Sequence, residues 1–232
     1  MLSDLKTQVK NFYGSKPPIP PAVADFLILT KTSLQVGIYP MLSDTFVLLF
    51  CTLCMQCSRY ISCLRFEIEK CTLEAFDTHK QVNIARSFSN MMTILKDLQK
   101  VFSLPSFLMF ATHYCACSTL LGWFVLGEIS SVSKILQILF YFSNSSVCLI
   151  ACLWVPGKLP IEIDKMKEAF RSKYRYRWFH LGVMEENVFE KAFGEQHTFV
   201  LTGVRFIEFK QSSILAVVGT ILSYTLVLVT RS

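Results

Sequence analysis

The chain has 232 residues, of which 52% are hydrophobic and only 17% are charged, and its mean hydropathy is +0.43. Soluble domains average about 25% charged residues, so the composition excludes an ordinary soluble domain and indicates an all-α, polytopic helical membrane protein. The net charge of +6 is better explained by basic loops beside apolar spans than by nucleic-acid binding.

Residues 1–39 form a polar tail followed by an ambiguous apolar segment. No signal peptide is expected, because residues 1–21 contain lysines and prolines and have no apolar core. Residues 22–39 are apolar enough to touch lipid, but Asp25 and Lys31 interrupt them and Pro40 closes them. The sequence leaves open whether they are the remnant of a spanning helix or a re-entrant piece.

Residues 40–58 are predicted to be the first transmembrane helix, with Asp44 placed near a water face or a cavity because a central charge is costly. Three cysteines at helical spacing, Cys51, Cys54 and Cys57, could suggest a thiolate metal site. No histidine or carboxylate lies close by to complete tetrahedral zinc, so we interpret them as apolar thiols and expect no cofactor.

Residues 59–103 are too polar to span and are predicted to be a cytosolic helical extension that packs against similar extensions. Its apolar residues recur at steps of three and four, which is typical of an amphipathic helix; they are Phe88, Met91, Met92, Leu95, Leu98 and Phe102.

Residues 105–127 and 132–155 are predicted to be the next two transmembrane helices. The short turn between them forces the two helices to run antiparallel, and Pro156-Gly157 is expected to end the second one.

Residues 156–210 are predicted to be a cytosolic anchor segment. Between Lys165 and Trp178, Lys and Arg alternate with aromatic residues. Such a pattern can stack nucleic acid, but its place after a spanning helix favours a juxtamembrane helix that faces lipid headgroups.

Residues 211–231 are predicted to be a pore-type transmembrane helix. The run from Gln211 to Thr230 has no charged residue and measures roughly 30 Å as a helix, the thickness of a bilayer core. Small and weakly polar residues step along one face: Ser212, Ala216, Gly219, Ser223, Val227 and Thr230. The stripe is compatible with close helix packing or with a water-filled path.

The distribution of Lys and Arg predicts the orientation. Residues 59–103 hold seven of them and residues 158–210 hold ten, which is 17 of the 23 in the chain, whereas the turn at 128–134 holds only Lys134. Because Lys and Arg accumulate on the cytoplasmic side, both polar blocks are expected in the cytosol and the C-terminus outside the cell.

The last segment resembles the final helix of arthropod gustatory receptors, part of the insect gustatory and odorant receptor superfamily. The family signature is Thr-Tyr, five apolar residues and Gln-Phe; here Ser223-Tyr224 stands for Thr-Tyr, and Thr230-Arg231 departs from Gln-Phe. The order of helices and extensions over residues 40–230 is similar to the family's last four spans. The resemblance implies a truncated version of a seven-helix chemoreceptor channel subunit.

The resemblance further implies a plasma-membrane, ligand-gated cation channel of four subunits, homo- or hetero-tetrameric, that contacts membrane lipid and responds to a small organic tastant. It places these residues along the pore: Gly219, Ser223, Val227, Thr230 and Arg231. An outer pocket for the tastant would draw on Tyr114, Ser118, Trp123, Phe140, Tyr141 and Asn144.

Two other hypotheses compete with a conducting channel. The first is a non-conducting fragment or partner subunit that assembles with full-length receptors, which Arg231 favours because an arginine from every subunit would repel cations. The second is a membrane enzyme, which the sequence disfavours because its four histidines are dispersed and form no paired motif.

Overall fold

The computed structural model describes residues 23, 26, 27, 30, 39–126, 132–182, 199–203 and 207–231. Four long helices dominate it: α3 (Tyr39–Lys70), α4 (Thr78–Leu126), α5 (Val132–Leu181) and α7 (Ser213–Arg231). Two short strands, β1 (Thr202–Gly203) and β2 (Ile207–Glu208), pair antiparallel between α5 and α7. The prediction of a mostly helical chain is confirmed.

The chain divides into two compact units, Met1–Phe46 and Val47–Ser232. In the first unit, Val23, Phe26, Leu27 and Thr30 are helical, and the Thr30 hydroxyl donates to the Phe26 carbonyl over 2.8 Å. Most of the ambiguous stretch 22–39 lies outside the described residues, as do the turn at 127–131 and residues 183–198 of the predicted anchor segment. The second unit holds the packed helices.

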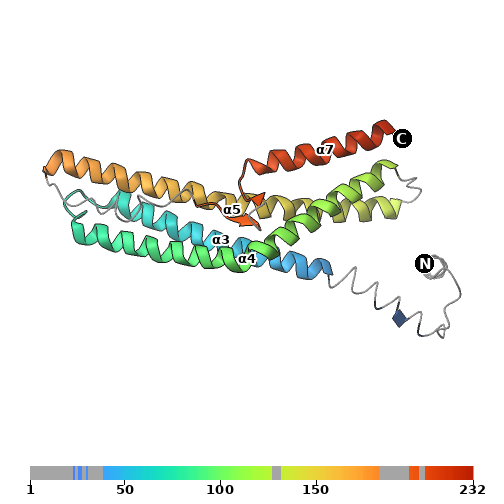
Figure 1. Cartoon of the computed structure of the whole chain (residues 1–232), viewed down its shortest axis with the longest axis horizontal. Helices are drawn as coiled ribbons and strands as arrows, with labels where there is room; N and C mark the ends of the chain where they lie inside the picture. The colour runs from blue at the N-terminus through green and yellow to red at the C-terminus, as the bar shows by residue number, and fades with distance from the viewer. Residues whose placement is uncertain are drawn as a thin grey trace. The chain divides into compact units, whose positions relative to one another are not determined.

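Helices α3 and α5 run parallel and in register within the second unit (Figure 1). Three interactions share nearly the same sequence offset: Cys51 Sγ to the Ala151 carbonyl at 3.6 Å, Ser62 Oγ to Glu162 Oε2 at 2.9 Å, and Lys173 Nζ to the Glu69 carbonyl at 3.3 Å. Helix α4 runs antiparallel to both. The three helices therefore share one core over much of their length.

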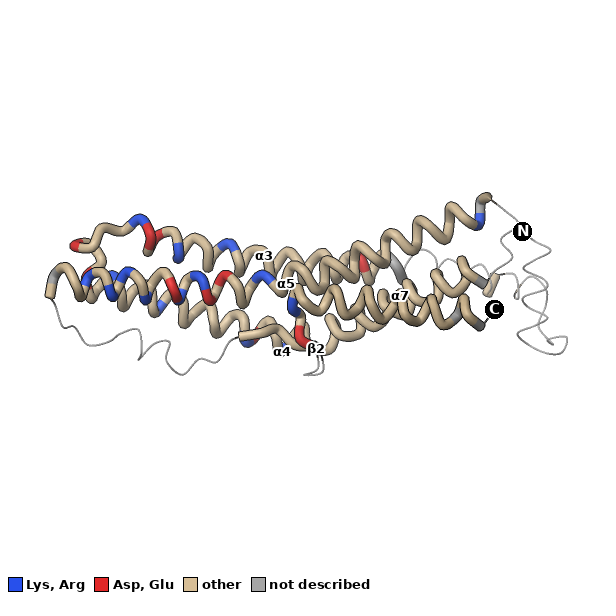
Figure 2. The backbone as a smooth tube through the Cα atoms, turned by 90° about the horizontal axis from the view of Figure 1, so that it is seen from above, with Lys and Arg blue, Asp and Glu red and all other residues tan. Residues whose placement is uncertain are grey.

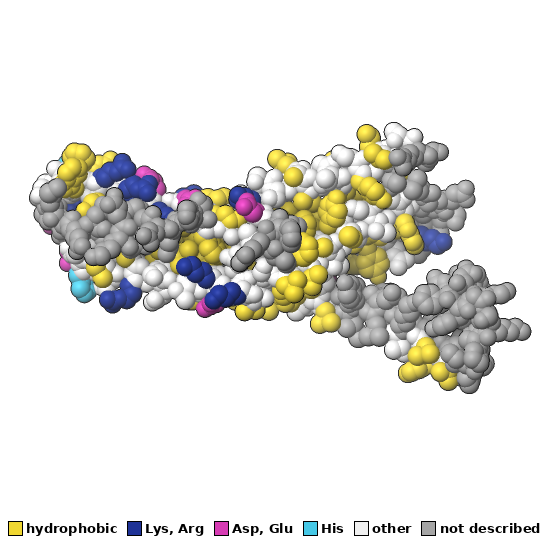
Figure 3. All heavy atoms as spheres, in the orientation of Figure 1, with side chains coloured by type: hydrophobic (Ala, Val, Ile, Leu, Met, Phe, Trp, Pro, Cys, Tyr) yellow, Lys and Arg dark blue, Asp and Glu magenta, His cyan; other side chains and the backbone are white. Residues whose placement is uncertain are grey.

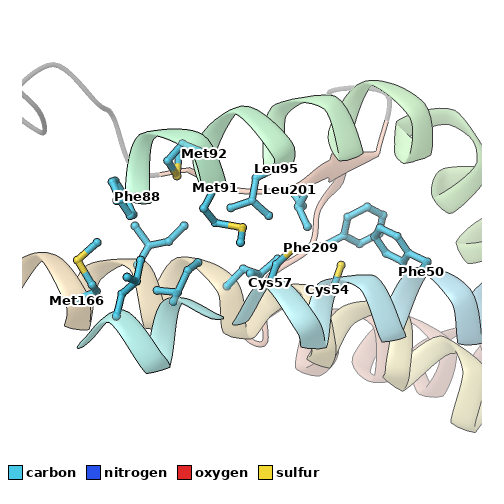
Figure 4. Packing of buried hydrophobic residues seen from close by; sticks show 14 of the residues in the cluster. Phe50, Cys54, Cys57, Phe88, Met91, Met92, Leu95, Met166, Leu201 and Phe209 are labelled. Carbon is cyan, nitrogen blue, oxygen red and sulfur yellow. The ribbon is translucent and has the colours of Figure 1, made fainter. Parts of the chain in front are cut away.

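That core consists of seams in which buried residues alternate at steps of three and four, as in a coiled coil. Figure 4 shows these side chains pointing toward one another from α3, α4 and α5. The buried seam of α3 is Phe50, Cys54, Cys57, Ile61, Leu64 and Ile68. The seam of α5 continues it with Cys152, Leu159, Ile163, Met166 and Phe170, and α4 contributes Ile84, Phe88, Met91 and Leu95.

Helix α4 does not end before Pro105, where the sequence analysis began a new span. It passes through Pro105 as one helix of 49 residues. A proline inside a helix leaves the carbonyl four residues earlier, here that of Val101, without its usual donor. Here Ser106 Oγ donates to the Ser103 carbonyl over 3.2 Å.

The expectation that Pro156-Gly157 ends the helix is wrong. Helix α5 continues through Pro156 and Pro160 for 50 residues. Both prolines are buried, and the seam on either side of them packs against α3 and α4. Tertiary packing therefore outweighs the local preference of proline to break a helix.

The charged residues of the second unit gather in one part of the bundle, which we call the stalk: residues 59–70 of α3, 78–100 of α4 and 158–181 of α5. Figure 2 shows Lys, Arg, Asp and Glu concentrated there, while the adjoining parts of the helices are almost free of charge. No Lys, Arg, Asp or Glu occurs in residues 45–58, 101–126, 135–157 or 211–230.

Cations of α5 hold the far end of the stalk together. Arg177 Nη1 donates to the Phe76 carbonyl over 2.6 Å, and Lys173 reaches the Glu69 carbonyl in the last turn of α3. Helix C-termini favour such cations because their last carbonyls have no partner within the helix. These basic residues thus serve the fold.

The continuity of α5 is incompatible with the prediction that the basic and aromatic residues between Lys165 and Trp178 face lipid headgroups. Trp178 lies 23 residues beyond Val155 on the same helix, or roughly 35 Å along its axis at 1.5 Å per residue. The headgroup layer on each side of a bilayer is only about 5–8 Å thick. If residues 132–155 cross a membrane, Trp178 stands well beyond it.

Candidate functional site

Within the described part of the chain, three helices are long and apolar enough to cross a membrane: Met41–Lys70, Thr78–Val125 and Lys134–His180. Their most apolar windows are poorly covered by the rest of the chain, since only 17% of the window in α4 and 22% of that in α5 is buried. Figure 3 shows hydrophobic side chains spread over the surface of this part of the second unit. So much exposed apolar surface is typical of helices that contact lipid.

The apolar stretch of α7, Ser213–Val227, is shorter than these three helices. α7 packs mainly on α4 and touches α5. Ile214, Val217 and Ile221 face the bundle, and Ile221 is 8% exposed. With 3.6 residues per turn, these positions recur on one side of the helix.

The small-residue stripe lies on the opposite side of α7. All six of its residues are exposed within the chain: Ser212, Ala216, Gly219, Ser223, Val227 and Thr230. A Cβ atom added at Gly219 would meet nothing within 4 Å. The stripe therefore does not pack on the described part of its own chain, which leaves close packing on another helix and contact with a water-filled path as explanations.

Two other positions of the receptor-like signature are also on open faces. Tyr224 is 50% exposed and Val227 is 49% exposed. The Thr230 hydroxyl donates to the Val227 carbonyl over 3.1 Å, so it bonds its own helix backbone. Arg231 is the last residue of α7, and its side chain lies outside the described part of the structure.

A junction hairpin leads into α7; we define it as residues 201–203 and 207–211. Leu201 and Phe209 are 2% and 1% exposed, and the Phe209 amide donates to the Leu201 carbonyl over 2.9 Å. The ring of Phe209 meets Phe50 of α3 edge-on at 6.2 Å. Figure 4 shows Phe209 and Leu201 inserted beside α3 and α4 at one end of the core.

Polar contacts tie the junction hairpin to α4. Gln99 Nε2 donates to Thr202 Oγ1 at 2.9 Å, and Ser103 Oγ donates to the Thr202 carbonyl at 3.1 Å. The hairpin lies beside one end of each charge-free stretch. The stretch of α4 begins at Val101, that of α5 ends at Gly157 and that of α7 begins at Gln211. These three ends lie at one level, as expected of a boundary between water and an apolar medium.

The predicted pocket residues come from the facing parts of α4 and α5. Cys117 Sγ lies 3.6 Å from Ser146 Oγ. At this pairing of the two antiparallel helices, Ser118 lies at about the same height as Asn144, and Trp123 lies at about the same height as Phe140. Trp123 and Phe140 are 69% and 70% exposed. These two side chains project outward, so the described chain alone does not enclose them in a pocket.

The other pocket residues are half-buried and already engaged within the chain. Tyr114 packs against the core, with its ring 6.3 Å from that of Phe110. The Ser118 hydroxyl donates to the Tyr114 carbonyl over 3.0 Å, and the Tyr141 ring meets Phe140 at 5.8 Å. A complete pocket at this place needs walls from other helices.

An open groove with charged walls lies between α3 and α5 in the stalk. Its lining is Arg65, Glu69, Lys165, Glu168, Ala169, Ser172, Lys173 and Tyr176. Beside it, Glu162 lies 3.6 Å from Arg65 and 3.1 Å from Lys165. Because the cations and carboxylates largely compensate each other, the groove suits adhesion between α3 and α5.

Sequence reasoning missed Gly157, Gly203 and Phe209, the residues that seat the start of α7. No periodicity marks them, because each is defined by a partner distant in the sequence. The proline-glycine pair at 156–157 was visible but was interpreted as a helix end.

A scan against protein-family models found no match for this chain, and a search of curated proteins found no significant match either.

Proposed function

We propose that this chain is a gustatory-receptor-like subunit of a ligand-gated cation channel. Four copies of α7 would stand around a central axis with Gly219, Ser223 and Val227 inward, and the stalk would lie in the cytosol because it carries most of the Lys and Arg. A small organic tastant would bind among the outer parts of α4 and α5, in a pocket completed by further helices.

The observation that supports this proposal is the orientation of α7. Its bulky residues Ile214, Val217 and Ile221 face the chain, while its small residues are exposed on the far side. Small residues gain little from contact with lipid but allow close approach of another helix or of water. A ring of α7 helices gives the stripe such a partner.

A second candidate is a non-conducting partner subunit that assembles with full-length receptors. Arg231 favours it, because four arginines at one end of a pore would repel cations. The exposure of Trp123 and Phe140 also favours it, since other helices must complete the pocket.

The double variant Thr230→Gln with Arg231→Phe separates the two candidates. Expressed in cells and recorded with a panel of tastants, it should give ligand-evoked cation current if the arginine is what blocks conduction. Thr230→Gln with Arg231→Lys keeps the charge and should leave the current of the parent unchanged. Current in the parent would support the channel, whereas current only in the variant with Arg231→Phe, with tetramers intact, would mean that Arg231 keeps the parent from conducting and would support the partner subunit.

Assembly is measured first, by native mass determination in lipid nanodiscs. A tetramer of this chain, or a mixed tetramer with a receptor subunit, is required by both candidates. Monomers under all conditions would overturn the pore assignment together with the partner-subunit alternative.

A further inference from the structure

The start of α7 is pressed against α5 with no room for a side chain between the two backbones. A Cβ atom built on Gly157 would lie 2.8 Å from the Gln211 amide nitrogen and 3.2 Å from the Lys210 carbonyl carbon. Real Cβ atoms are not found this close to a backbone atom. Any residue other than glycine at 157 must therefore push the start of α7 away from α5.

A second glycine sits on the α4 side of the same junction. A Cβ atom on Gly203 would lie 3.1 Å from the Phe209 ring and 3.2 Å from Cβ of Phe107. The ring of Phe209 is itself held in the core by Phe50. A side chain at 203 would therefore crowd the Phe209 ring and Phe107, and one of them would have to shift by a few tenths of an ångström.

The first turn of α7 depends on the hairpin for its hydrogen bonds. The Ser213 amide donates to the Lys210 carbonyl over 3.1 Å, and the Ser213 hydroxyl donates to the Glu208 carbonyl over 3.1 Å. Helix starts need such partners because their first amides have none within the helix. Wherever the hairpin moves, the first turn of α7 moves with it.

Beyond that turn, α7 contacts the bundle through one face, where Ile221 is 8% exposed. On its other faces Leu215 is 79% exposed, Leu222 61% and Leu226 67%. The place where the helix begins is fixed between Gly157 of α5 and the hairpin on α4.

We propose that Gly157 and Gly203 are positioning residues for α7. Through them, a shift of α4 or α5 at the junction is transmitted to α7 and changes the position of its small-residue stripe. The effect on conduction rests on the channel function proposed above, but the role of the two glycines in positioning α7 does not.

Hydrogen exchange of the purified full chain in nanodiscs tests whether the two glycines position α7. In Gly157→Ala, amides at 207–214 should exchange at least tenfold faster than in the parent, while amides of the stalk core at 84–95 keep their rates. Alanine is a better helix former than glycine, so the change favours α5 itself and any loosening reports the contact with Gln211.

Gly219→Ala is the matched control, since it makes the same change on α7 where nothing lies within 4 Å. It should leave exchange at 207–214 as in the parent. Gly203→Ala should loosen the same amides, and Phe209→Leu added to it should restore part of their protection by removing the ring atom that the new methyl meets.

The proposal is overturned if Gly157→Ala and Gly203→Ala exchange like Gly219→Ala, or if the stalk core loosens equally, because that would report general destabilisation. In a form of the chain that conducts, Gly157→Ala and Gly203→Ala should shift the tastant concentration for half-activation. The unitary conductance should stay unchanged. Faster exchange without that shift would overturn transmission to the pore. A chain that never conducts refutes the channel, and the exchange data then still decide the positioning role.

Discussion

The stalk and α7 invert the usual relation between hydrophobicity and burial. The stalk is rich in charge, yet Ile61, Ile68 and Phe170 within it are completely buried. Helix α7 has no charge between Gln211 and Thr230, yet Leu215 and Leu226 are 79% and 67% exposed. The stalk folds as a coiled coil in water would, around its own core. Helix α7 instead presents apolar surfaces that the described residues of its own chain leave uncovered.

The stalk and α7 differ in whether their apolar and small side chains find packing partners within the chain. In the stalk, the buried seam residues find their packing partners within one chain. In α7, the face with Ile214, Val217 and Ile221 packs on the bundle, whereas the small-residue face has no partner among the described residues of the chain.

The largest effect is expected in the stalk core. Phe170 of α5 is completely buried and meets Phe76 edge-on at 5.2 Å, so Phe170→Ala should lower the free energy of unfolding by about 3–5 kcal/mol. Phe179, nine residues further along α5, is 76% exposed, and Phe179→Ala should change it by less than about 0.5 kcal/mol. Thermal and denaturant unfolding in detergent measure both. Equal losses would contradict the described packing.

The next effect concerns the hydrogen bond that Arg177 donates at the far end of the stalk. Arg177→Ala removes the hydrogen bond to the Phe76 carbonyl and should cost about 1.5–3 kcal/mol, as for other bonds to charged groups. Arg175→Ala removes the same charge from an exposed position and serves as the control. If the two variants unfold alike, the basic residues act through net charge rather than through this bond.

A smaller effect should distinguish the two faces of α7. Ile221→Ala opens space on the packed face, where Ile221 is 8% exposed, whereas Leu222→Ala changes a residue that is 61% exposed. We expect Ile221→Ala to cost roughly 1–2 kcal/mol, less than in a water-soluble core because lipid replaces some of the lost contacts. Melting temperatures in the same nanodiscs measure the difference. A larger loss for Leu222→Ala would mean that α7 is rotated.

The sequence predicted the parts of this comparison that depend on local contrast. The seam of α4 at Phe88, Met91 and Leu95 was predictable because polar residues surround it. The seam of α3 was not, because residues near Phe50 and Cys54 are apolar on all sides and no periodicity stands out. In α5 the seam passes through Pro156, which local rules interpret as a stop.

The candidate site was predictable in composition but not in geometry. The stripe at Gly219 and Ser223 is visible in the sequence, whereas the side of α7 that packs on the bundle is set by tertiary contacts. The same holds for Gly157, whose role appears only when Gln211 is placed beside it. The outward projection of Trp123 and Phe140 likewise depends on how α4 and α5 are rotated.

The smallest effect is a pH dependence within the stalk. Burial alone raises the pKa of Glu162, but hydrogen bonds from Lys165 and Ser62 and the charges of Lys165 and Arg65 outweigh it, so the pKa lies below its usual value of 4.5. A carboxylate with a lowered pKa stabilises the fold at pH values above its unfolded-state pKa. That stabilisation is lost as the pH falls below about 4.5 and through the folded-state value.

Glu162→Gln should therefore reduce stability at neutral pH by less than about 1 kcal/mol, since partly exposed ion pairs contribute little. As the pH falls through the folded-state pKa, which lies below 4.5, the variant and the parent should converge, because both then lack the negative charge. Glu168→Gln, at a carboxylate that is 64% exposed and paired with Arg171, should follow the parent throughout. Melting temperatures measured from acid to neutral pH decide the matter. A gap between Glu162→Gln and the parent that widens toward acid would mean that the link between α3 and α5 depends on shape rather than on charge.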